Sequence, residues 1–297
     1  MAALSSLLGF AARVDAGISV PKEGLWPGKP AVVPLIICTQ TEPDPDDRKH
    51  CAMAKVAPLD ANLTSLVRNA VDYWRKKLGP NVYFDITTSF QQGAVMVGAS
   101  ADPGSCDTSW AGYRFVGQQV VHIGTNCLNA ATVRGTVLHE FGHVVGLHHE
   151  QRRSNRDDFL VVDNETMSRN VAACKTLGTA KAIAACQSWY YQWHITCDPA
   201  VPLSDCRIDF RDPATSSPLF KPERGVSRGD YDPGSIMQYP VFPDFKPGAT
   251  NAVVGLKPPM YDWLARNGKN ERYLGQRADL SDGDIATLKE MYPGATP

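Results

Sequence analysis

The stretch that decides the fold is His139-Glu-Phe-Gly-His143-Val-Val-Gly146-Leu-His148-His149-Glu150. His139 and His143 are four residues apart, which places both rings on one face of an α-helix, close enough to share a metal ion. Gly146 can adopt the left-handed conformation that ends a helix, so the chain can turn and bring His149 to the same ion. Three neutral imidazoles leave a fourth position open for water, as in catalytic zinc sites. The stretch therefore predicts one catalytic Zn²⁺ held by these three His, with His148 as a neighbour outside the register.

The residue after the first His gives this pattern its chemistry. Glu140 can reach the same side of the metal, and in the motif H-E-x-x-H this Glu is the general base of a zinc protease. A His pair at helical spacing is otherwise a surface pair or a satisfied pair in the core. The third His, in register after a glycine, favours the zinc site over that alternative.

Two further segments, outside the metal motif, are similar to segments of one known protease family. The motif continues into Glu150-Gln-Arg-Arg-Ser-Asn-Arg-Asp-Asp158, and a later segment reads Tyr231-Asp-Pro-Gly-Ser-Ile-Met-Gln-Tyr239. The first is similar to the Arg- and Asp-rich tail of the astacin family of metzincin metalloproteases. The second is similar to that family's Met-turn, in which a His stands where this chain has Gln238. The resemblance runs from about Leu25 to Tyr292, with an interruption between the two segments.

The resemblance implies an α+β fold for this chain. The expected architecture is a metzincin-like zinc protease domain, with a twisted, mostly parallel sheet and the active-site helix in its upper half. The lower half is expected to be largely irregular and to end in a C-terminal helix. Residues 1–24 are interpreted as an N-terminal extension, either a signal segment or a remnant of a pro-segment. Residues 25–297 form the catalytic domain, with a Cys-containing insertion at about 171–225.

The resemblance also assigns roles to individual residues. Tyr239 is expected to bind the metal and to swing away to stabilise the oxyanion, whereas ordinary packing is the alternative for a Tyr after a turn. Met237 is expected to form an apolar floor beneath the His rings, and is otherwise a flexible core side chain. Glu150 is expected to anchor a trimmed N-terminus that starts around residues 17–22. The alternative is a surface Glu that pairs with Arg153 or Arg156.

Eight cysteines, an even number without any C-x-x-C pair, favour disulfides in an oxidising compartment over free buried thiols. Cys38 and Cys51 bracket a charged, Pro-rich segment, residues 41–48, that is expected to be a solvated loop and that they could staple. The family resemblance implies a Cys106–Cys127 disulfide. The insertion holds Cys174, Cys186, Cys197 and Cys206, which allow three pairings, and short loops favour Cys174–Cys186 and Cys197–Cys206.

Hydrophobic patterns predict the regular elements. Strands are expected at 31–37, 82–87, 94–97 and 118–123. One apolar stripe predicts a helix at about 60–77 with Asp60 as its N-cap, and the metal helix is expected to follow Asn129 and to end near Val145. Gly135 and Gly142 interrupt the metal helix, which suggests close packing against a neighbouring element. Ser281 and Asp284 predict a capping box at the start of a terminal helix.

Composition limits the partners. With 30 basic and 31 acidic residues the chain has a net charge of −1, which makes nucleic acid a poor partner, and no apolar run approaches the length of a membrane span. The leading hypothesis is a secreted, monomeric zinc endopeptidase that acts on proteins or peptides. The alternatives are a non-catalytic binding or adhesion protein with the same fold, and a zinc hydrolase that acts on a non-protein bond.

Overall fold

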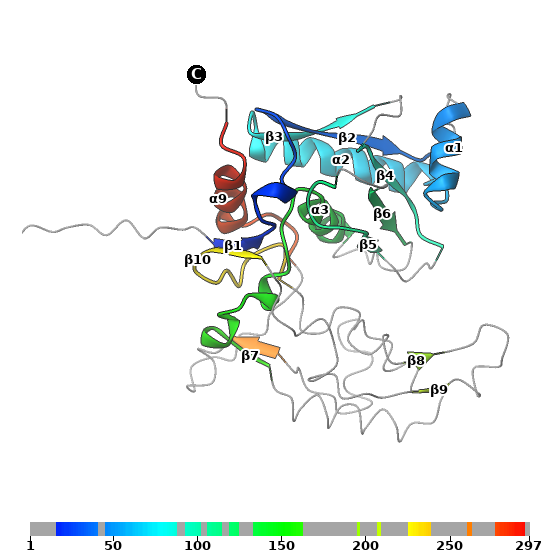
Figure 1. Ribbon diagram of the computed structural model, residues 1–297. Helices are drawn as coiled ribbons and strands as arrows, with labels where there is room; N and C mark the ends of the chain where they lie inside the picture. The colour runs from blue at the N-terminus through cyan, green and yellow to red at the C-terminus, as the bar shows by residue number, and fades with distance from the viewer. Residues whose placement is uncertain are drawn as a thin grey trace, which may run out of the picture.

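The computed structural model describes residues 16–40, 45–87, 93–101, 106–114, 119–124, 133–162, 195–196, 207–208, 225–238, 260–262 and 277–294. Its centre is a five-stranded sheet in the order β3-β2-β4-β6-β5 (Figure 1). Strands β2 (Ala31–Ile37), β3 (Val82–Ile86), β4 (Val95–Ala99) and β6 (Gln119–Ile123) are parallel, and β5 (Cys106–Thr108) is an antiparallel edge strand. The α+β architecture and the four long strands are as predicted, whereas β5 was not predicted as a strand.

The two faces of the sheet have different coverings. Side chains such as Leu35, Val97 and Val121 face the main core, which they share with α2 (Ala61–Leu78) and α3 (Val133–Val144). The alternate residues Ile36 and Met96 face a smaller cluster that also contains Cys51 and Val56. Buried on both faces, the strands read as continuous apolar runs, which is typical of parallel sheets.

Helix α2 confirms the predicted stripe, and Asp60 confirms the predicted cap. The Asp60 side chain accepts a hydrogen bond from the Leu63 backbone N–H at 2.8 Å. The interpretation of 41–48 as a loop is wrong in its second half, because α1 runs over Pro45–Met53. Proline is favoured in the first turn of a helix, and Pro45 is the first residue of α1. The expected staple is present, since Cys38 and Cys51 form a disulfide.

A short N-terminal strand, β1 (Ala16–Ser19), is a feature that the sequence pattern did not predict. It pairs antiparallel with β10 (Val226–Gly229), and Figure 1 shows it beside the terminal helix α9 (Asp282–Met291). A Cβ on Gly17 would lie 2.6 Å from the Thr287 hydroxyl oxygen of α9, so only glycine allows this approach. Residues 16–19 therefore pack on the body of the protein, while the division proposed at residue 25 stays a prediction.

The remaining described elements are short. After the 3-10 turns at Lys22–Gly24, Glu150–Arg152 and Arg156–Asp158, β7 (Leu160–Val162) pairs with β11 (Met260–Asp262). Within the predicted insertion, β8 (Ile195–Thr196) pairs with β9 (Arg207–Ile208). The four cysteines of the insertion lie outside the described residues. No helix in the described ranges combines the length and the apolar character that crossing a membrane requires.

Candidate active site

Two glycines let helix α3 lie unusually close to its neighbours, as predicted. A Cβ on Gly135 would lie 1.9 Å from the Arg277 carbonyl oxygen, and one on Gly142 would lie 2.5 Å from the Met237 sulfur. Side chains at these positions would push the helix away from the segment before α9 and from the Met-turn segment, residues 231–239. The glycines thus bring the His-bearing face of α3 against the Met-turn segment.

Gly146 ends α3 in the left-handed conformation that the sequence predicted, with φ +97°. Carbonyls at the end of α3 and in the turn that follows have partners: the Trp26 indole N–H donates to Val144 O and the Tyr292 hydroxyl donates to Val145 O. The Val20 backbone N–H donates to Gly146 O. Because helix ends leave such carbonyls without intrahelical partners, these bonds hold the turn that leads to His149.

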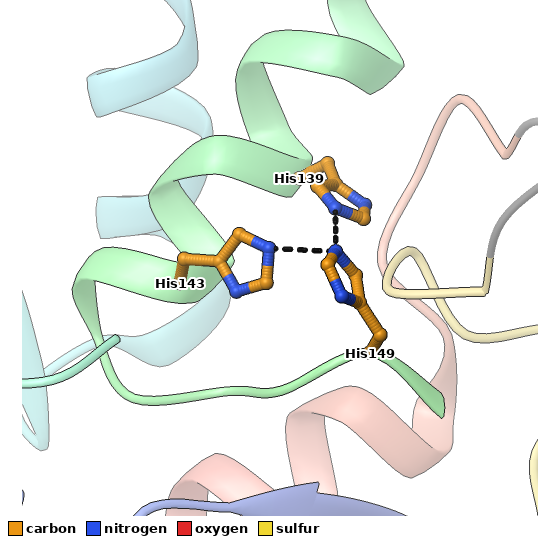
Figure 2. Close-up of side chains that lie close together, drawn as sticks. All are labelled: His139, His143 and His149. Atoms are coloured by element: carbon orange, nitrogen blue, oxygen red, sulfur yellow. Dashed lines mark hydrogen bonds between the residues drawn. The ribbon is translucent and has the colours of Figure 1, made fainter. Parts of the chain in front are cut away.

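The three His side chains predicted to bind metal come together at one point (Figure 2). The Nε2 atom of His149 lies 3.0 Å from that of His143 and 3.2 Å from that of His139. Two rings come from consecutive turns of α3, and the third comes from the chain after the Gly146 turn. Of the described residues, these three alone form a His, Cys, Asp or Glu cluster whose ligand atoms all lie within 4.8 Å of one another.

Hydrogen bonds to carbonyls set the protonation of two rings. His139 Nδ1 lies 2.8 Å from Ile236 O, and His143 Nδ1 lies 2.8 Å from Leu147 O. A carbonyl only accepts, so each Nδ1 carries a proton and the neutral ring turns its Nε2 lone pair towards the cluster. Burial lowers the pKa of His139 to about 4 and the pKa values of His143 and His149 well below the ordinary value. The rings are therefore neutral near pH 7, as metal ligation requires.

The cluster fits a tetrahedral metal. Zn–N bonds of about 2.0–2.1 Å at tetrahedral angles separate the ligand atoms by about 3.3 Å. The observed spacings are 3.0 and 3.2 Å. Lone pairs on neutral rings repel one another at this distance unless a cation lies between them. The donor set and its spacing therefore suit one zinc ion.

Glu140 lies beside this cluster, on the turn of α3 that carries His139. Its carboxylate accepts a hydrogen bond from the Thr108 hydroxyl at 2.8 Å, and Thr108 belongs to the edge strand β5. Burial raises the pKa of Glu140 to about 8, which the Thr108 hydrogen bond partly opposes and the nearby Asp107 carboxylate increases. Sequence reasoning did not identify Thr108, because its link to Glu140 spans 32 residues.

Met237 lies in the described part of the Met-turn segment, and its expected role beneath the His rings stays a prediction. The Met237 side chain is buried against Gly142, and its carbonyl accepts the Glu150 backbone N–H at 3.2 Å. Gln238, which replaces the family's His, is buried and accepts a hydrogen bond from the Tyr231 hydroxyl. Tyr239 lies outside the described residues, so its expected contact with the metal stays a prediction.

A carboxylate from the terminal helix supports the same segment. Asp284, 1% exposed, accepts hydrogen bonds from the Ser235 hydroxyl at 2.6 Å and the Ile236 backbone N–H at 2.8 Å. It also forms the predicted capping box with Ser281. The carbonyl of Ile236 accepts a hydrogen bond from His139, so a single residue, Ile236, connects Asp284 to the His cluster.

Glu150 pairs with Arg153 at 3.1 Å, and both side chains are fully buried rather than on the surface. Burial raises the pKa of Glu150 to about 7, although the Arg153 guanidinium lowers it. One carboxylate oxygen, Oε2, is buried without a hydrogen-bond partner. The expected anchoring of a trimmed N-terminus by Glu150 stays a prediction.

Cys106 of β5 is also disulfide-bonded, and no cysteine in the described ranges is free. Its expected partner, Cys127, lies outside the described residues. The Cys106–Cys127 pairing, which the resemblance implied, therefore stays a prediction.

Known proteins resemble this chain in sequence. The model of the family described as Astacin (Peptidase family M12A) matches residues 56–190, which include the His cluster. Blastula protease 10 of Paracentrotus lividus is 36% identical over 240 residues, 80% of this chain and 30% of that protein. The chain belongs to the astacin family. The beta subunit of meprin A from Mus musculus is 27% identical over 189 residues, 64% of this chain and 19% of that protein.

The fold of this astacin-family chain also has solved counterparts. High choriolytic enzyme 1, a hatching-enzyme zinc protease from the medaka fish Oryzias latipes, superposes with a TM-score of 0.53 at 16% identity, covering 94% of this chain and all of that one. Myroilysin gives a TM-score of 0.52 with the same identity and coverage. These likenesses concern the fold. The chain spans about 30% of the length of the first curated relative it matches and 28% of the second, Protein SpAN of Strongylocentrotus purpuratus.

Proposed function

We propose that this protein is a secreted, zinc-dependent endopeptidase that hydrolyses internal peptide bonds of proteins. The observation that carries the proposal is that the Nε2 atoms of His143 and His139 lie 3.0 and 3.2 Å from that of His149, next to the buried carboxylate of Glu140. His139, His143 and His149 would hold one catalytic zinc ion. When bound, zinc is a Lewis acid that makes water nucleophilic near neutral pH and polarises the peptide carbonyl.

Glu140 carries the proton transfers in this proposal. A carboxylate with a pKa near the working pH can take a proton from water and return it to the leaving amine. The hydrogen bond from Thr108 fixes one carboxylate oxygen, so the other is available to the reacting water. Burial of Glu140 excludes bulk solvent and strengthens each electrostatic contact it makes.

Tyr239 is proposed both to bind the metal and to stabilise the oxyanion. The support is its position two residues after Met237, whose buried contact with Gly142 agrees with a Met-turn beneath the His rings. A phenol hydroxyl that donates to the developing oxyanion would contribute about 10²–10³ in rate. This role follows from the resemblance of residues 231–239 to the Met-turn of the astacin family.

The names of the relatives support proteins or peptides as substrates, since the Paracentrotus lividus relative is named a protease and the medaka structure a zinc protease. The disulfide between Cys38 and Cys51 supports an oxidising, extracytosolic location. A monomer is proposed for the oligomeric state, and sedimentation of the purified chain would test it.

The experiment that tests the function combines metal analysis with proteolysis. The purified protein should contain about one zinc per chain, cleave casein, lose activity on chelation and recover it when zinc is restored. Zinc-loaded protein that cleaves neither casein nor a peptide library would overturn the endopeptidase and favour a non-catalytic binding protein. Hydrolysis of esters or amides without cleavage of any peptide would favour a zinc hydrolase of non-protein bonds.

A further inference from the structure

A pocket of about 480 Å³ opens directly beside the His cluster. His143 and His149 line it on one side, and the end of β5 with the loop that follows, from Thr108 to Arg114, lines the other. The N-terminal segment at Val20 forms a third wall. A substrate chain that reaches the His cluster therefore places neighbouring side chains in this pocket.

The residues that line the pocket carry positive charge and no carboxylate. None of the twelve lining residues is Asp or Glu, and Arg114 is the one permanently charged group among them. A pocket with this lining attracts an anion and disfavours a Lys or Arg side chain.

Arg114 is positioned rather than free to move. Its guanidinium carbon lies 3.6 Å from the centroid of the Trp110 ring, and both side chains are exposed. Stacking on an indole face orients the guanidinium and leaves its N–H edges open, which is the arrangement that binds a carboxylate through two parallel hydrogen bonds. Arg114 has no hydrogen bond or ion pair with any residue in the part of the chain that the structure describes.

The backbone that carries Arg114 is fixed by contacts with the active-site helix. The Gly112 backbone N–H donates to the carbonyl of His143 at 2.8 Å, and the Tyr113 N–H donates to Gly24 O at 2.7 Å. A Cβ on Gly112, whose φ is +71°, would lie 2.3 Å from that same Gly24 oxygen. The loop is therefore held at a set position relative to a metal ligand, as a specificity site requires.

The direction of β5 decides which part of a substrate meets Arg114. In the described sheet β5 is an edge strand, so its outer side can pair with an extended peptide. Antiparallel pairing of strands is more stable than parallel pairing. The chain of β5 runs from Cys106 to Thr108 and continues towards Trp110, and the Thr108 hydroxyl donates a hydrogen bond to Glu140. An antiparallel peptide whose scissile bond lies near Glu140 thus places the residues that precede this bond beside Trp110 and Arg114.

We propose that Arg114, stacked on Trp110, binds an acidic side chain on the N-terminal side of the scissile bond and so selects Asp- or Glu-containing substrates. This inference rests on the proposed endopeptidase function. The contact is a charge-assisted, bidentate hydrogen bond at a partly exposed site, and it should favour Glu over Gln by about 5- to 10-fold in kcat/KM.

The test uses quenched fluorescent peptides of one sequence that differ only by Glu or Gln at the first, second or third residue before the cleaved bond. The wild-type chain should prefer Glu at one of these positions, and 0.5 M NaCl should reduce the preference. Arg114→Gln should lower the ratio of kcat/KM for the Glu peptide to kcat/KM for the Gln peptide to about one, and Arg114→Glu should favour Lys instead. Arg75→Gln, an exposed Arg on α2 away from the pocket, is the matched control and should keep the preference.

Each outcome separates the two proposals. If the wild-type chain cleaves no peptide, the endopeptidase function fails and the inference fails with it. If it cleaves Glu and Gln peptides equally, the function stands and the role of Arg114 is refuted. A preference for Glu that persists in Arg114→Gln, or that appears only after the scissile bond, also refutes it.

Discussion

Arg153 offers the sharpest test of what holds the chain around the His cluster. This side chain is 0% exposed, and its guanidinium lies 3.1 Å from the Glu150 carboxylate. Glu150 directly follows His149, so the pair is attached to a predicted metal ligand. The same guanidinium also donates to the carbonyls of β1, β10 and the residue after β10, namely Gly17, Arg228, Gly229 and Asp230.

The perturbation is Arg153→Met, which keeps much of the apolar stem and removes the charge. Breaking a buried ion pair by removing one partner costs about 3–5 kcal/mol, because the other charge is left uncompensated. The four backbone carbonyls lose their donor as well, and each such loss costs about 1 kcal/mol where water cannot replace it. We therefore expect a loss of about 4 kcal/mol or more in the free energy of unfolding, with release of the N-terminal strand β1.

The assay is urea unfolding followed by tryptophan fluorescence, in a Glu140→Gln background so that self-cleavage does not interfere. Glu150→Gln combined with Arg153→Met removes both charges, so this double variant should be less destabilised than the sum of the single variants by about 2 kcal/mol. Asp72→Asn, which breaks an exposed pair with Arg75, is the control and should change stability by less than about 1 kcal/mol.

Two results would refute this reasoning. One is an Arg153→Met chain within 1 kcal/mol of its parent. The other is strict additivity of Glu150→Gln and Arg153→Met, because coupled partners in a buried pair cannot behave independently. Limited proteolysis gives a second readout, since cleavage within residues 16–24 should accelerate in the single variant.

Three further predictions concern the helix, the Met-turn and the oxyanion. Gly135→Ala should lower the melting temperature although alanine favours helices by about 1 kcal/mol, because its Cβ would lie 1.9 Å from Arg277 O; a higher melting temperature would contradict the close packing. Burial raises the pKa of Asp284 to about 6, so its stabilising contribution is full below the ordinary pKa of 3.8 and is lost as the pH rises through about 6. Unfolding free energies should therefore show the wild-type chain losing stability relative to Asp284→Asn between pH 4 and 7, and a constant or opposite difference would exclude this titration. Tyr239→Phe should lower kcat by about 10²–10³ and leave the zinc content unchanged; unchanged kcat with loss of zinc would assign Tyr239 a structural role instead.

The His cluster could be predicted from sequence because its geometry is local. The spacing of His139 and His143 follows the helical period, and Gly146 marks the turn that returns His149. The long strands were predictable for a similar reason, since buried parallel strands read as continuous β-branched runs. Asp60 at the start of α2 is a cap whose partner lies three residues away, so it too is visible in the sequence.

The parts that sequence reasoning missed depend on distant contacts. Strand β1 forms because its backbone pairs with that of β10, some 200 residues later in the chain. No periodicity in residues 16–19 indicates this pairing. Arg153 was considered only as a surface partner for Glu150, because burial of an Arg depends on carbonyls that other segments supply. Thr108 and Asp284 reach Glu140 and the Met-turn segment across 32 and 48 residues, which no local motif encodes.

The wrong expectation for residues 45–48 has a different cause. Charged and Pro-rich composition favours a loop on average, yet the same residues in the order Pro45-Asp46-Asp47 are also those that begin a helix. Position within the segment, rather than its composition, decided the outcome for α1.

The proposed function requires that Glu140, buried beside three converging His, acts as the base of a zinc peptidase. Glu140→Gln tests it most directly, because the amide keeps the shape of the side chain and leaves His139, His143 and His149 untouched. Zinc content and casein cleavage should be measured on the same preparations of wild-type and variant chain. Both chains should contain about one zinc each, and the variant should show peptidase activity lowered by about 10²–10⁴. Near-normal cleavage by a zinc-loaded Glu140→Gln chain would contradict it.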